Sequence, residues 1–564
     1  MNNNKGFAST FILFSLLVLF LIVMSILLFT MNNSSVLNSG LKNKLINEIE
    51  TKSDKELGKI TVSLNLNGGT INSPGNWESI INADEITTYS RQINYEEQYG
   101  PIPEPVRAGY TFKGWYDSTS VGDVSISASS DNNNNYKALK YGLAPGATYT
   151  ITMDKAEGTA NKFTVRIFDF DAEEHAGEED YNYEDYILAE KIVDASNNAI
   201  TIKIKCPMTA NSLGKVRLVV YAGEAGSTAN QSMTFKNVKV GTMGTTTETK
   251  IENNTVLKYT ENHQLFAKWT GNTYTVKAVA SGGSITSTTG WTGTGETATK
   301  TITVGDSYGT LPTLANRNPT AVQDYTLKGW KSLPDGYIDL DYIEAPNSYY
   351  INTGYPLTNV SIVEVRYTLN TENKAIFGVI DLPGKKSYAL VDTSSSNKKM
   401  YVYYAGVYDS FPNDITHGYT SGNIDDVRIY QYTNYNISTT STKLGTGPNL
   451  SSDSTAFTTE SIFLFGVNRI DNTDGNPIRA TGGSRIYYFR EYRHDDRPKK
   501  LIHYYVPCQR ESDNALGMYD LVTDTFMTLS NTTEGQSATT ITAKTITDTA
   551  TVTTPRSHTI YAMW

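Results

Sequence analysis

The chain is poor in the residues that build disulfide frameworks, metal centres and basic surfaces. Only 2 of its 564 residues are cysteine, Cys206 and Cys508, and they fall in different predicted domains, which argues against a disulfide framework. Cys206 stands among apolar residues, so we expect a buried, unreactive thiol. Lysine and arginine number 48, against 58 aspartates and glutamates. The net charge of −10 opposes binding to nucleic acid and suits an extracellular surface.

Lysine-rich helical runs are also scarce, whereas tyrosine, threonine, asparagine, glycine and serine are abundant. Tyrosine and threonine favour strands, and glycine, asparagine and serine favour turns. A chain of 564 residues is too long for one core, because cores stop growing at about 250–300 residues. The composition therefore predicts several mainly β domains.

One long apolar run, Phe7 to Thr30, carries no charge and is long enough to cross a bilayer as a helix. It is too long for the core of a signal peptide, and no small-residue cleavage site follows it. Lys5 precedes the run and the next basic residue is Lys42, which places the N-terminus in the cytoplasm and the bulk of the chain outside. We therefore expect a single-pass protein of the cell membrane.

The stretch Lys5-Gly6-Phe7 also resembles the leader of type IV pilins, which is cut after the glycine. That family has glutamate at the fifth mature position, where this chain has Phe11. The resemblance implies an alternative to a plain signal anchor, namely a minor pilin-like structural subunit of a surface fibre. In either case the helical spacing of apolar residues from Asn38 to Lys55 predicts a stalk helix.

The six tryptophans indicate an internal repeat. They form three pairs of similar sequence context, Trp77 with Trp291, Trp115 with Trp330, and Trp269 with Trp564. The first two pairs are separated by 214 and 215 residues and the third by 295, so extra chain lies inside the second copy. Repeated segments of this kind indicate one module present twice. Such a small module must bury large rings, so we expect Trp115, Trp269, Trp330 and Trp564 in the core.

The alternation from Lys59 to Asn67 predicts a strand that ends at Gly68-Gly69. A second short strand is expected over Ile93 to Tyr99, followed by a proline-rich extended crossing. Another strand, Gly109-Tyr-Thr-Phe-Lys-Gly-Trp115, comes next, and Gln264-Leu-Phe-Ala-Lys-Trp269 follows far downstream.

These motifs, echoed at Tyr325-Thr-Leu-Lys-Gly-Trp330 and Ile560-Tyr-Ala-Met-Trp564, resemble the Listeria–Bacteroides repeat, also called the internalin B-repeat. The resemblance implies a small β-grasp-like module of bacterial surface proteins. We expect two such repeats, each interrupted by an inserted β-sandwich, because a loop tip tolerates an insertion whose ends lie close together. The expected parts are a cytoplasmic tip and anchor (1–30), a stalk (31–58), the first repeat (59–117 plus 248–269), its insertion (118–247), the second repeat (270–332 plus 534–564) and its insertion (333–533).

The first insertion shows short alternating strands at the spacing of a β-sandwich. Its Leu143-Ala-Pro-Gly-Ala-Thr-Tyr149 turn and its last strand, Met233 to Val240, resemble carbohydrate-binding modules. Clustered carboxylates between Asp169 and Asp185 lack the spacing of a calcium loop and are interpreted as a solvated loop. His175, within it, has no partner at zinc-ligand spacing.

The second insertion contains Tyr349-Tyr-Ile-Asn-Thr-Gly-Tyr355, an apolar strand over Ser461 to Asn468, and Arg485-Ile-Tyr-Tyr-Phe489. With Val506-Pro-Cys508 and Gly517-Met-Tyr-Asp520 these motifs resemble a bacterial concanavalin A-like (laminin G-like) jelly roll. That resemblance implies two curved antiparallel sheets and a family that includes lectin-like binders.

No catalytic signature is found in the sequence. Retaining glycosidases of this fold need two carboxylates on one face, usually as Glu-x-Asp-x-x-Glu, and that spacing is absent. Asp425-Asp426 and Asp495-Asp496 are adjacent pairs, which we interpret as loop residues. The histidines His417, His494 and His503 lack a recognisable nucleophile motif. We therefore expect a protein that is not an enzyme, with a hydrolase as the least favoured alternative.

The candidate ligand sites are few. Asp471 and Asp474, in Asp471-Asn-Thr-Asp-Gly475, have the residue types of a Ca²⁺ loop, although an ordinary turn has the same composition. Glycan binding by such sandwiches requires exposed aromatic residues, and the candidates are Tyr401, Tyr403, Tyr404 and Tyr408. We expect no cofactor, with Ca²⁺ as the one alternative left open. The predicted function is a membrane-anchored surface adhesin for glycans or for proteins of host or neighbouring cells.

Overall fold

The computed structural model describes the part of the chain that follows residue 58, with gaps. The described residues are 59–81, 87–128, 136–170, 183–208, 210, 215–224, 230–287, 289–315, 325–358, 360–369, 374–381, 386–392, 400–404, 407–410, 425–429, 435–439, 442–444, 459–469, 478–480, 484–493, 500–531 and 536–564. Within these ranges no helix is long and apolar enough to cross a membrane. The predicted span Phe7–Thr30 and the predicted stalk both lie outside them.

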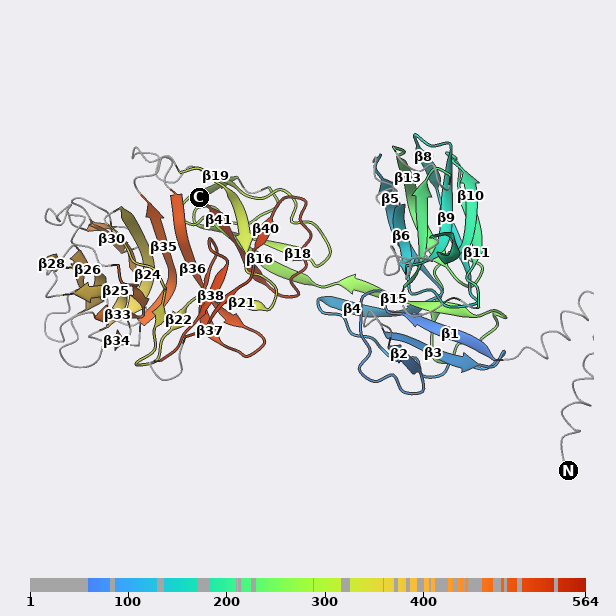
Figure 1. Cartoon of the computed structure of the whole chain (residues 1–564), viewed down its shortest axis with the longest axis horizontal. Helices are drawn as coiled ribbons and strands as arrows, with labels where there is room; N and C mark the ends of the chain where they lie inside the picture. Colours follow the sequence, from blue (N-terminus) through green and yellow to red (C-terminus); the bar gives the residue numbers. More distant parts are fainter. Residues whose placement is uncertain are drawn as a thin grey trace, which may run out of the picture. The chain divides into compact units, whose positions relative to one another are not determined.

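The chain divides into two compact units, Met1–Thr270 and Gly271–Trp564. Both are built of strands, and the helix found among the described residues is a single short 3₁₀ turn, η2 (Tyr183–Tyr186). The prediction of a mainly β protein with sandwich-like sheets is therefore confirmed (Figure 1).

The sheet of the first repeat joins strands from both ends of the first unit. Its order is β14-β4-β15-β1-β3-β2. Strands β1 and β15 lie side by side in parallel, with Val62 opposite His263. The chain leaves this sheet after β4 and returns at β14, so the residues between them are an excursion from one folded module. The strands are β1 (Ile60–Asn65), β2 (Glu78–Ile81), β3 (Thr87–Ile93), β4 (Tyr110–Tyr116), β14 (Lys250–Ile251) and β15 (His263–Gly271).

The excursion forms a two-sheet sandwich. One sheet has the order β10-β9-β12-β6 and the other β11-β7-β13-β5, with β8 on β13. Their facing side chains form one core, in which the Phe163 and Phe235 rings are 5.0 Å apart. Cys206 is buried in this core, as expected. The strands are β5 (Ser118–Ile126), β6 (Tyr136–Tyr141), β7 (Thr148–Met153), β8 (Lys155–Gly158), β9 (Lys162–Asp169), β10 (Ile187–Asp194), β11 (Ile200–Lys205), β12 (Val216–Ala222) and β13 (Met233–Gly241).

The second repeat has the same plan. Its sheet order is β18-β16-β41-β20-β40, and β16 lies parallel to β41 with Val276 opposite His558. A separate pair, β17 and β19, completes it. The strands are β16 (Thr273–Val279), β17 (Ser284–Ser287), β18 (Thr297–Thr303), β19 (Thr313–Ala315), β20 (Gly329–Ser332), β40 (Lys544–Ile546) and β41 (His558–Met563).

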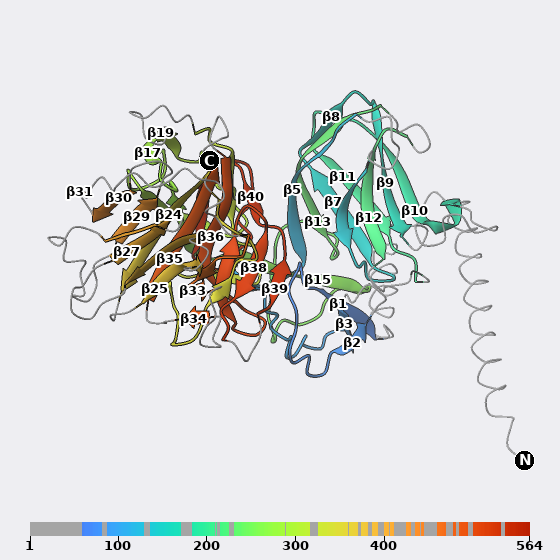
Figure 2. The ribbon, with the colours of Figure 1, turned by 60° about the vertical axis from the view of Figure 1, so that its left-hand side comes forward.

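Two sheets form the sandwich inserted in the second repeat (Figure 2). The first follows β31-β30-β29-β24-β35-β36-β37-β38-β39, with β21 on β36 and β22 on β35; the second follows β23-β32-β25-β26-β27-β28, with β33 on β25 and β34 on β33. Their shared core includes Val363, Phe377 and Phe489. The bounds are β21 (Tyr337–Asp339), β22 (Ile343–Glu344), β23 (Ile351–Asn352), β24 (Ser361–Leu369), β25 (Ala375–Asp381), β26 (Lys386–Asp392), β27 (Met400–Tyr404), β28 (Val407–Ser410), β29 (Asp425–Ile429), β30 (Tyr435–Thr439), β31 (Thr442–Leu444), β32 (Phe463–Leu464), β33 (Gly466–Arg469), β34 (Ile478–Ala480), β35 (Ser484–Arg493), β36 (Lys500–Arg510), β37 (Leu516–Asp520), β38 (Thr525–Thr528) and β39 (Ala538–Thr540).

The tryptophans and glycines of the two repeats occupy matching positions. Trp269 donates from Nε1 to the carbonyl of Leu66 at 3.0 Å, and Trp564 donates to Ala280 at 2.9 Å. The two repeats carry the glycine pairs Gly68-Gly69 and Gly282-Gly283, and the second glycine of each pair lies beneath the corresponding ring. A Cβ on Gly69 would stand 2.5 Å from Trp269, and a Cβ on Gly283 would stand 2.3 Å from Trp564. Five of the six tryptophans are buried and Trp269 is half-buried, so large rings form the core as expected.

Three local predictions were wrong. Ile93 ends a strand instead of starting one, because the chain turns at once, with Glu97 N donating to Asn94 O and Glu96 at a φ of 67°. The apolar run Ser461–Asn468 is broken at Phe465, whose φ of 62° separates β32 from β33. Asp425 and Asp426 begin β29 and are not loop residues.

The prediction that the repeats are β-grasp-like agrees with their strands but not with the helix that the prediction implies. A β-grasp fold carries a helix across its sheet, and the described parts of both repeats contain none. What they do share with that fold is the parallel pairing of the first and last strands.

Candidate functional site

A cleft of about 390 Å³ lies between the second repeat and its inserted sandwich, within the second unit. We call it the tyrosine cleft, because five tyrosines line it, namely Tyr342, Tyr487, Tyr488, Tyr504 and Tyr561. Tyr342 is 37 % exposed, Tyr487 and Tyr488 are half-buried, and Tyr504 and Tyr561 are buried. A cleft of this size that combines apolar rings with a few polar groups has the usual composition of a small-ligand site.

Most residues that line the tyrosine cleft belong to the outer face of the inserted sandwich. Residues of β24, β35 and β36 alternate between the core and this face, so that Arg366, Tyr488 and Tyr504 point away from the core residues Val365 and Phe489. Arg366 lies opposite Tyr488 in the β24–β35 register. A bulge next to this pair leaves no β24 residue opposite Tyr487 in the register, and bulges often redirect a side chain beside a site.

Arg490 supports the tyrosines from beneath. It is 2 % exposed, and its guanidinium carbon lies 3.9 Å from the centre of the Tyr488 ring and 5.2 Å from that of Tyr504. Its Nε is 3.6 Å from the carboxylate of Glu364 on the neighbouring strand. These contacts hold the Tyr488 ring in one orientation, which lowers the entropy that a ligand must remove on binding.

Charged pairs join the two walls of the tyrosine cleft. Arg366 of the sandwich contacts Glu296 of the repeat through both guanidinium nitrogens, at 2.9 and 3.1 Å. Lys277 of the repeat is 3.7 Å from Asp341 of the sandwich. Such exposed pairs contribute only about 0–1 kcal/mol each, so their main effect is to position the walls and to supply polar groups at the rim.

A second and larger cleft, of about 610 Å³, lies in the first unit. It is formed by β1 with the turn that follows, by Tyr89, and by the end of β6. Lys140, on β6, places its Nζ 3.0 Å from Asn67 Oδ1 and 5.4 Å from the centre of the Phe266 ring. Burial lowers the pKa of Lys140 to about 8. We call this the lysine cleft.

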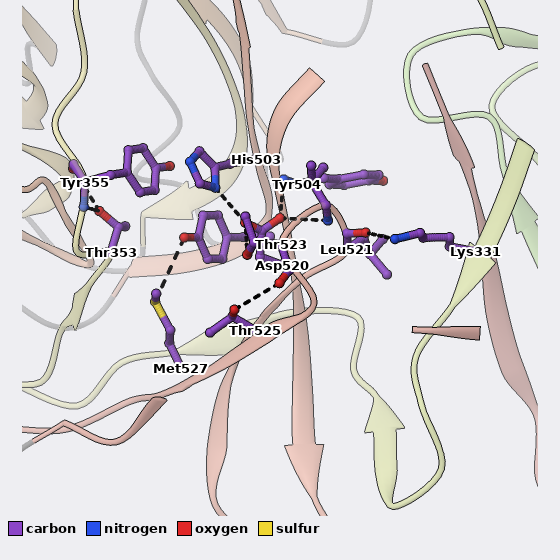
Figure 3. Close-up of polar contacts among 12 residues, drawn as sticks. Lys331, Thr353, Tyr355, His503, Tyr504, Asp520, Leu521, Thr523, Thr525 and Met527 are labelled. Carbon is purple, nitrogen blue, oxygen red and sulfur yellow. Dashed lines mark hydrogen bonds and ion pairs between the residues drawn. The ribbon is translucent and has the colours of Figure 1, made fainter. Parts of the chain in front are cut away.

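A histidine–carboxylate pair, His503 with Asp520, lies elsewhere in the second unit (Figure 3). The two side chains are 2.6 Å apart, and the Tyr355 ring stacks on His503 at 3.7 Å. Asp520 is buried and also accepts from the backbone N–H of Tyr504 and Val522 and from Thr523 Oγ1. Burial opposes ionisation of Asp520, but the bonds from His503 and the backbone lower its pKa below the usual value. The pair lines neither cleft, and its bonds organise the turn between β37 and β38.

Each repeat buries a tyrosine–histidine pair that the sequence analysis missed. Tyr99 Oη is 2.8 Å from His263 Nε2, and Tyr308 Oη is 2.7 Å from His558 Nε2. In both cases Nδ1 faces a backbone carbonyl, of Glu261 or Arg556, so Nδ1 carries the proton and Nε2 accepts from the tyrosine. Burial lowers the pKa of His263 to about 4 and also lowers that of His558. The sequence did contain a signal for these pairs, because each repeat has a Tyr-Gly dipeptide and a histidine in its last strand.

Asp339 joins the inserted sandwich to the last strand of the second repeat. Its carboxylate accepts from Thr559 N at 3.1 Å and from Tyr561 Oη at 3.0 Å. Burial raises the pKa of Asp339 to about 6, despite these two bonds. A carboxyl whose folded pKa is raised contributes stability below its unfolded pKa near 3.8, and this contribution is lost as the pH rises towards 6.

Asp339→Asn should remove that pH dependence. Asparagine keeps the shape and can accept from Thr559 N while its amide donates to Tyr561 Oη. Relative to the unmodified protein, the variant should gain about 2 kcal/mol in the second unit between pH 4 and pH 7. Urea unfolding followed by tryptophan fluorescence measures this, with the transition of the first unit as internal control. An equal pH dependence in both proteins would contradict the assignment.

The predicted tyrosines belong to two neighbouring strands of the inserted sandwich. Tyr401, Tyr403 and Tyr404 belong to β27 and Tyr408 to β28, where the register sets Tyr403 opposite Tyr408. Asp471 and Asp474 lie outside the described residues. No group of three histidines, cysteines or carboxylates suited to a metal occurs in the part of the chain that the structure describes.

Residues 61–136 match the family model of the Listeria-Bacteroides repeat domain. The match covers the first strands of the first repeat and ends at the start of β6, whereas β15, which completes the sheet, lies far downstream. No curated protein matches the chain. Among solved structures, domains LG4-5 of the mouse laminin alpha1 chain are weakly similar, with 7% identity over 70% of this chain and 93% of that chain. The TM-score is 0.19, too low to carry an argument about function.

Proposed function

We propose that this protein is a bacterial cell-surface binding protein that recognises glycans through the tyrosine cleft. The observation that carries the proposal is the set of three accessible tyrosines, Tyr342, Tyr487 and Tyr488, in one cleft. The apolar face of an aromatic ring packs against the C–H face of a sugar, and tyrosine brings large contact area at low entropic cost. The charged rim supplies partners for sugar hydroxyls.

The acidic composition and the repeat match favour a surface location. We propose that the apolar run Phe7–Thr30 anchors the chain in the membrane, that the two repeats act as spacers, and that the protein is not an enzyme and needs no resident cofactor. Intact-mass measurement of the purified protein tests the anchor: cleavage after Gly6 would instead favour the pilin-like subunit.

The tyrosine cleft is tested by glycan binding of the full-length protein in detergent. Tyr487→Ala and Tyr488→Ala should each weaken binding of array-positive glycans about tenfold, because each removes a ring from the cleft. Tyr274→Ala is the matched control, since Tyr274 is also a half-buried strand tyrosine but does not line the cleft. Equal affinities in all three variants, or no bound glycan with the unmodified protein, would reject the proposal.

A further inference from the structure

The lysine cleft contains the cation Lys140 and no acidic residue among the described residues that line it. Lys140 contacts Asn67 and Phe266, and no carboxylate among the described residues pairs with it. A partly buried ammonium without a counter-ion is unfavourable, and the lowered pKa of Lys140 reflects that cost. One of its three N–H donors is used by Asn67, so two remain for another acceptor.

A second cation lies beside the same turn. Arg107 donates from Nη1 to the carbonyl of Asn67 at 3.0 Å, and its guanidinium would be 3.4 Å from a Cβ on Gly68, a residue of the cleft wall. Its other contact is the Tyr110 ring at 3.8 Å. Two cations therefore flank Asn67, and neither is paired with a carboxylate in the described structure. The local field favours an anion.

The rest of the wall suits a sugar. Asn65 and Asn67 make the wall polar, although their amides already bond to neighbouring groups. The turn offers backbone groups, and Leu64, Leu66 and Ile71 offer apolar surface. Tyr141, at the rim, is 54 % exposed, and the guanidinium carbon of Arg217 lies 5.1 Å from the centre of its ring. One cation in the wall, Lys140, and a second beside it, Arg107, stand among neutral hydrogen-bonding groups, which matches a ligand with a carboxylate and several hydroxyls. The volume, about 610 Å³, lies within the range of small-ligand sites.

We propose that the lysine cleft is a second binding site, specific for an acidic sugar, with Lys140 binding the sugar carboxylate. The site lies in the first unit and is independent of the tyrosine cleft. The protein would then recognise two features of a surface polysaccharide, one neutral and one acidic.

The probe is trigalacturonic acid, with galactotriose as its neutral counterpart, titrated into the full-length protein in detergent by calorimetry. Trigalacturonic acid should bind, galactotriose should bind at least tenfold more weakly, and added salt should weaken the first interaction. Lys140→Ala should lower the affinity at least tenfold, and Lys140→Arg should retain most of it. Lys137→Ala is the matched control, because Lys137 is an exposed lysine of the same strand outside the cleft.

Several outcomes would overturn the proposal. These are equal binding of the acidic and neutral trisaccharides, equal effects of Lys140→Ala and Lys137→Ala, or no heat with trigalacturonic acid at millimolar concentration. Equal binding of hexaglutamate would identify an acidic peptide as the ligand in place of a sugar. Thermal midpoints of the variants exclude loss of folding. Tyr488→Ala should leave trigalacturonic acid binding unchanged, which separates failure of this site from failure of the tyrosine cleft.

Discussion

Acidification from pH 7 to pH 4 is expected to destabilise the first repeat, because it buries a neutral histidine. In the second unit the buried His558 acts in the same direction, whereas Asp339 acts in the opposite one. The pKa of His263 falls from 6.5 to about 4 on folding, so the unfolded chain binds the proton more tightly than the folded one. The stability contributed by a group with a depressed folded pKa is present above pH 6.5 and is lost as the pH falls towards 4. For His263 the loss is about 3 kcal/mol.

The protein carries its own reporter for this effect. All six tryptophans lie in the repeats, so tryptophan fluorescence follows the repeats and not the inserted sandwiches. The double variant His263→Gln with His558→Gln keeps an acceptor for Tyr99 and Tyr308 and removes the titrating group. The urea midpoint of its first unit should change less between pH 7 and pH 4 than that of the unmodified protein. If both proteins lose the same stability over this range, the buried histidines are not responsible.

Adding one methyl group to the second glycine of either Gly-Gly pair is expected to be strongly destabilising. In Gly69→Ala the new Cβ would stand 2.5 Å from Trp269 and 3.1 Å from the carbonyl of Val106. In Gly283→Ala it would stand 2.3 Å from Trp564. The ring cannot retreat without breaking its bond to Leu66 or Ala280, so each substitution should cost about 3 kcal/mol.

The control is Gly75→Ala, in the same repeat. Gly75 has a φ of 62° and open space around its Cβ position, so alanine there should cost only the left-handed backbone strain, about 1 kcal/mol. Unfolding by urea, followed by tryptophan fluorescence, ranks the variants. In a Trp269→Phe background the penalty of Gly69→Ala should shrink, because phenylalanine lacks the outer ring that the Cβ meets. A penalty as small as that of Gly75→Ala would contradict this account of the Gly-Gly motif.

Local patterns predicted most strands because a strand leaves a period-two signature along the chain. The expected strands Lys59–Asn67 and Gly109–Trp115 differ from the observed Ile60–Asn65 and Tyr110–Tyr116 by only one or two residues at each end. One prediction failed because a positive φ angle at Phe465 interrupts an apolar run. Without that angle the same residues would form one continuous strand. Asp425 and Asp426 were misassigned for the converse reason, because pairing with β24 recruits polar residues into a strand.

The binding candidates were harder to predict. The tyrosines of β27 and β28 were chosen as aromatic residues that a glycan-binding sandwich could expose. The tyrosine cleft takes its tyrosines from β35, β36, β41 and the segment before β22. No local pattern connects Tyr342 with Tyr561, which is 219 positions away. Lys140 is an ordinary strand lysine in the sequence, and it becomes notable only when the turn after β1 lies against it.

By itself the sequence determined that this protein is mainly β, that one module occurs twice, and that paired tryptophans and glycines belong to matching places. These features follow from the composition, from the alternation of apolar and polar residues, and from the similarity of the two repeats. All three can be seen along the sequence without knowing which distant residues meet. Only the tertiary structure decided which tyrosines share a cleft, which histidines are buried beside a tyrosine, and where a lysine lacks a counter-ion. Those properties depend on desolvation and on contacts between distant segments, and neither exists until the chain is folded.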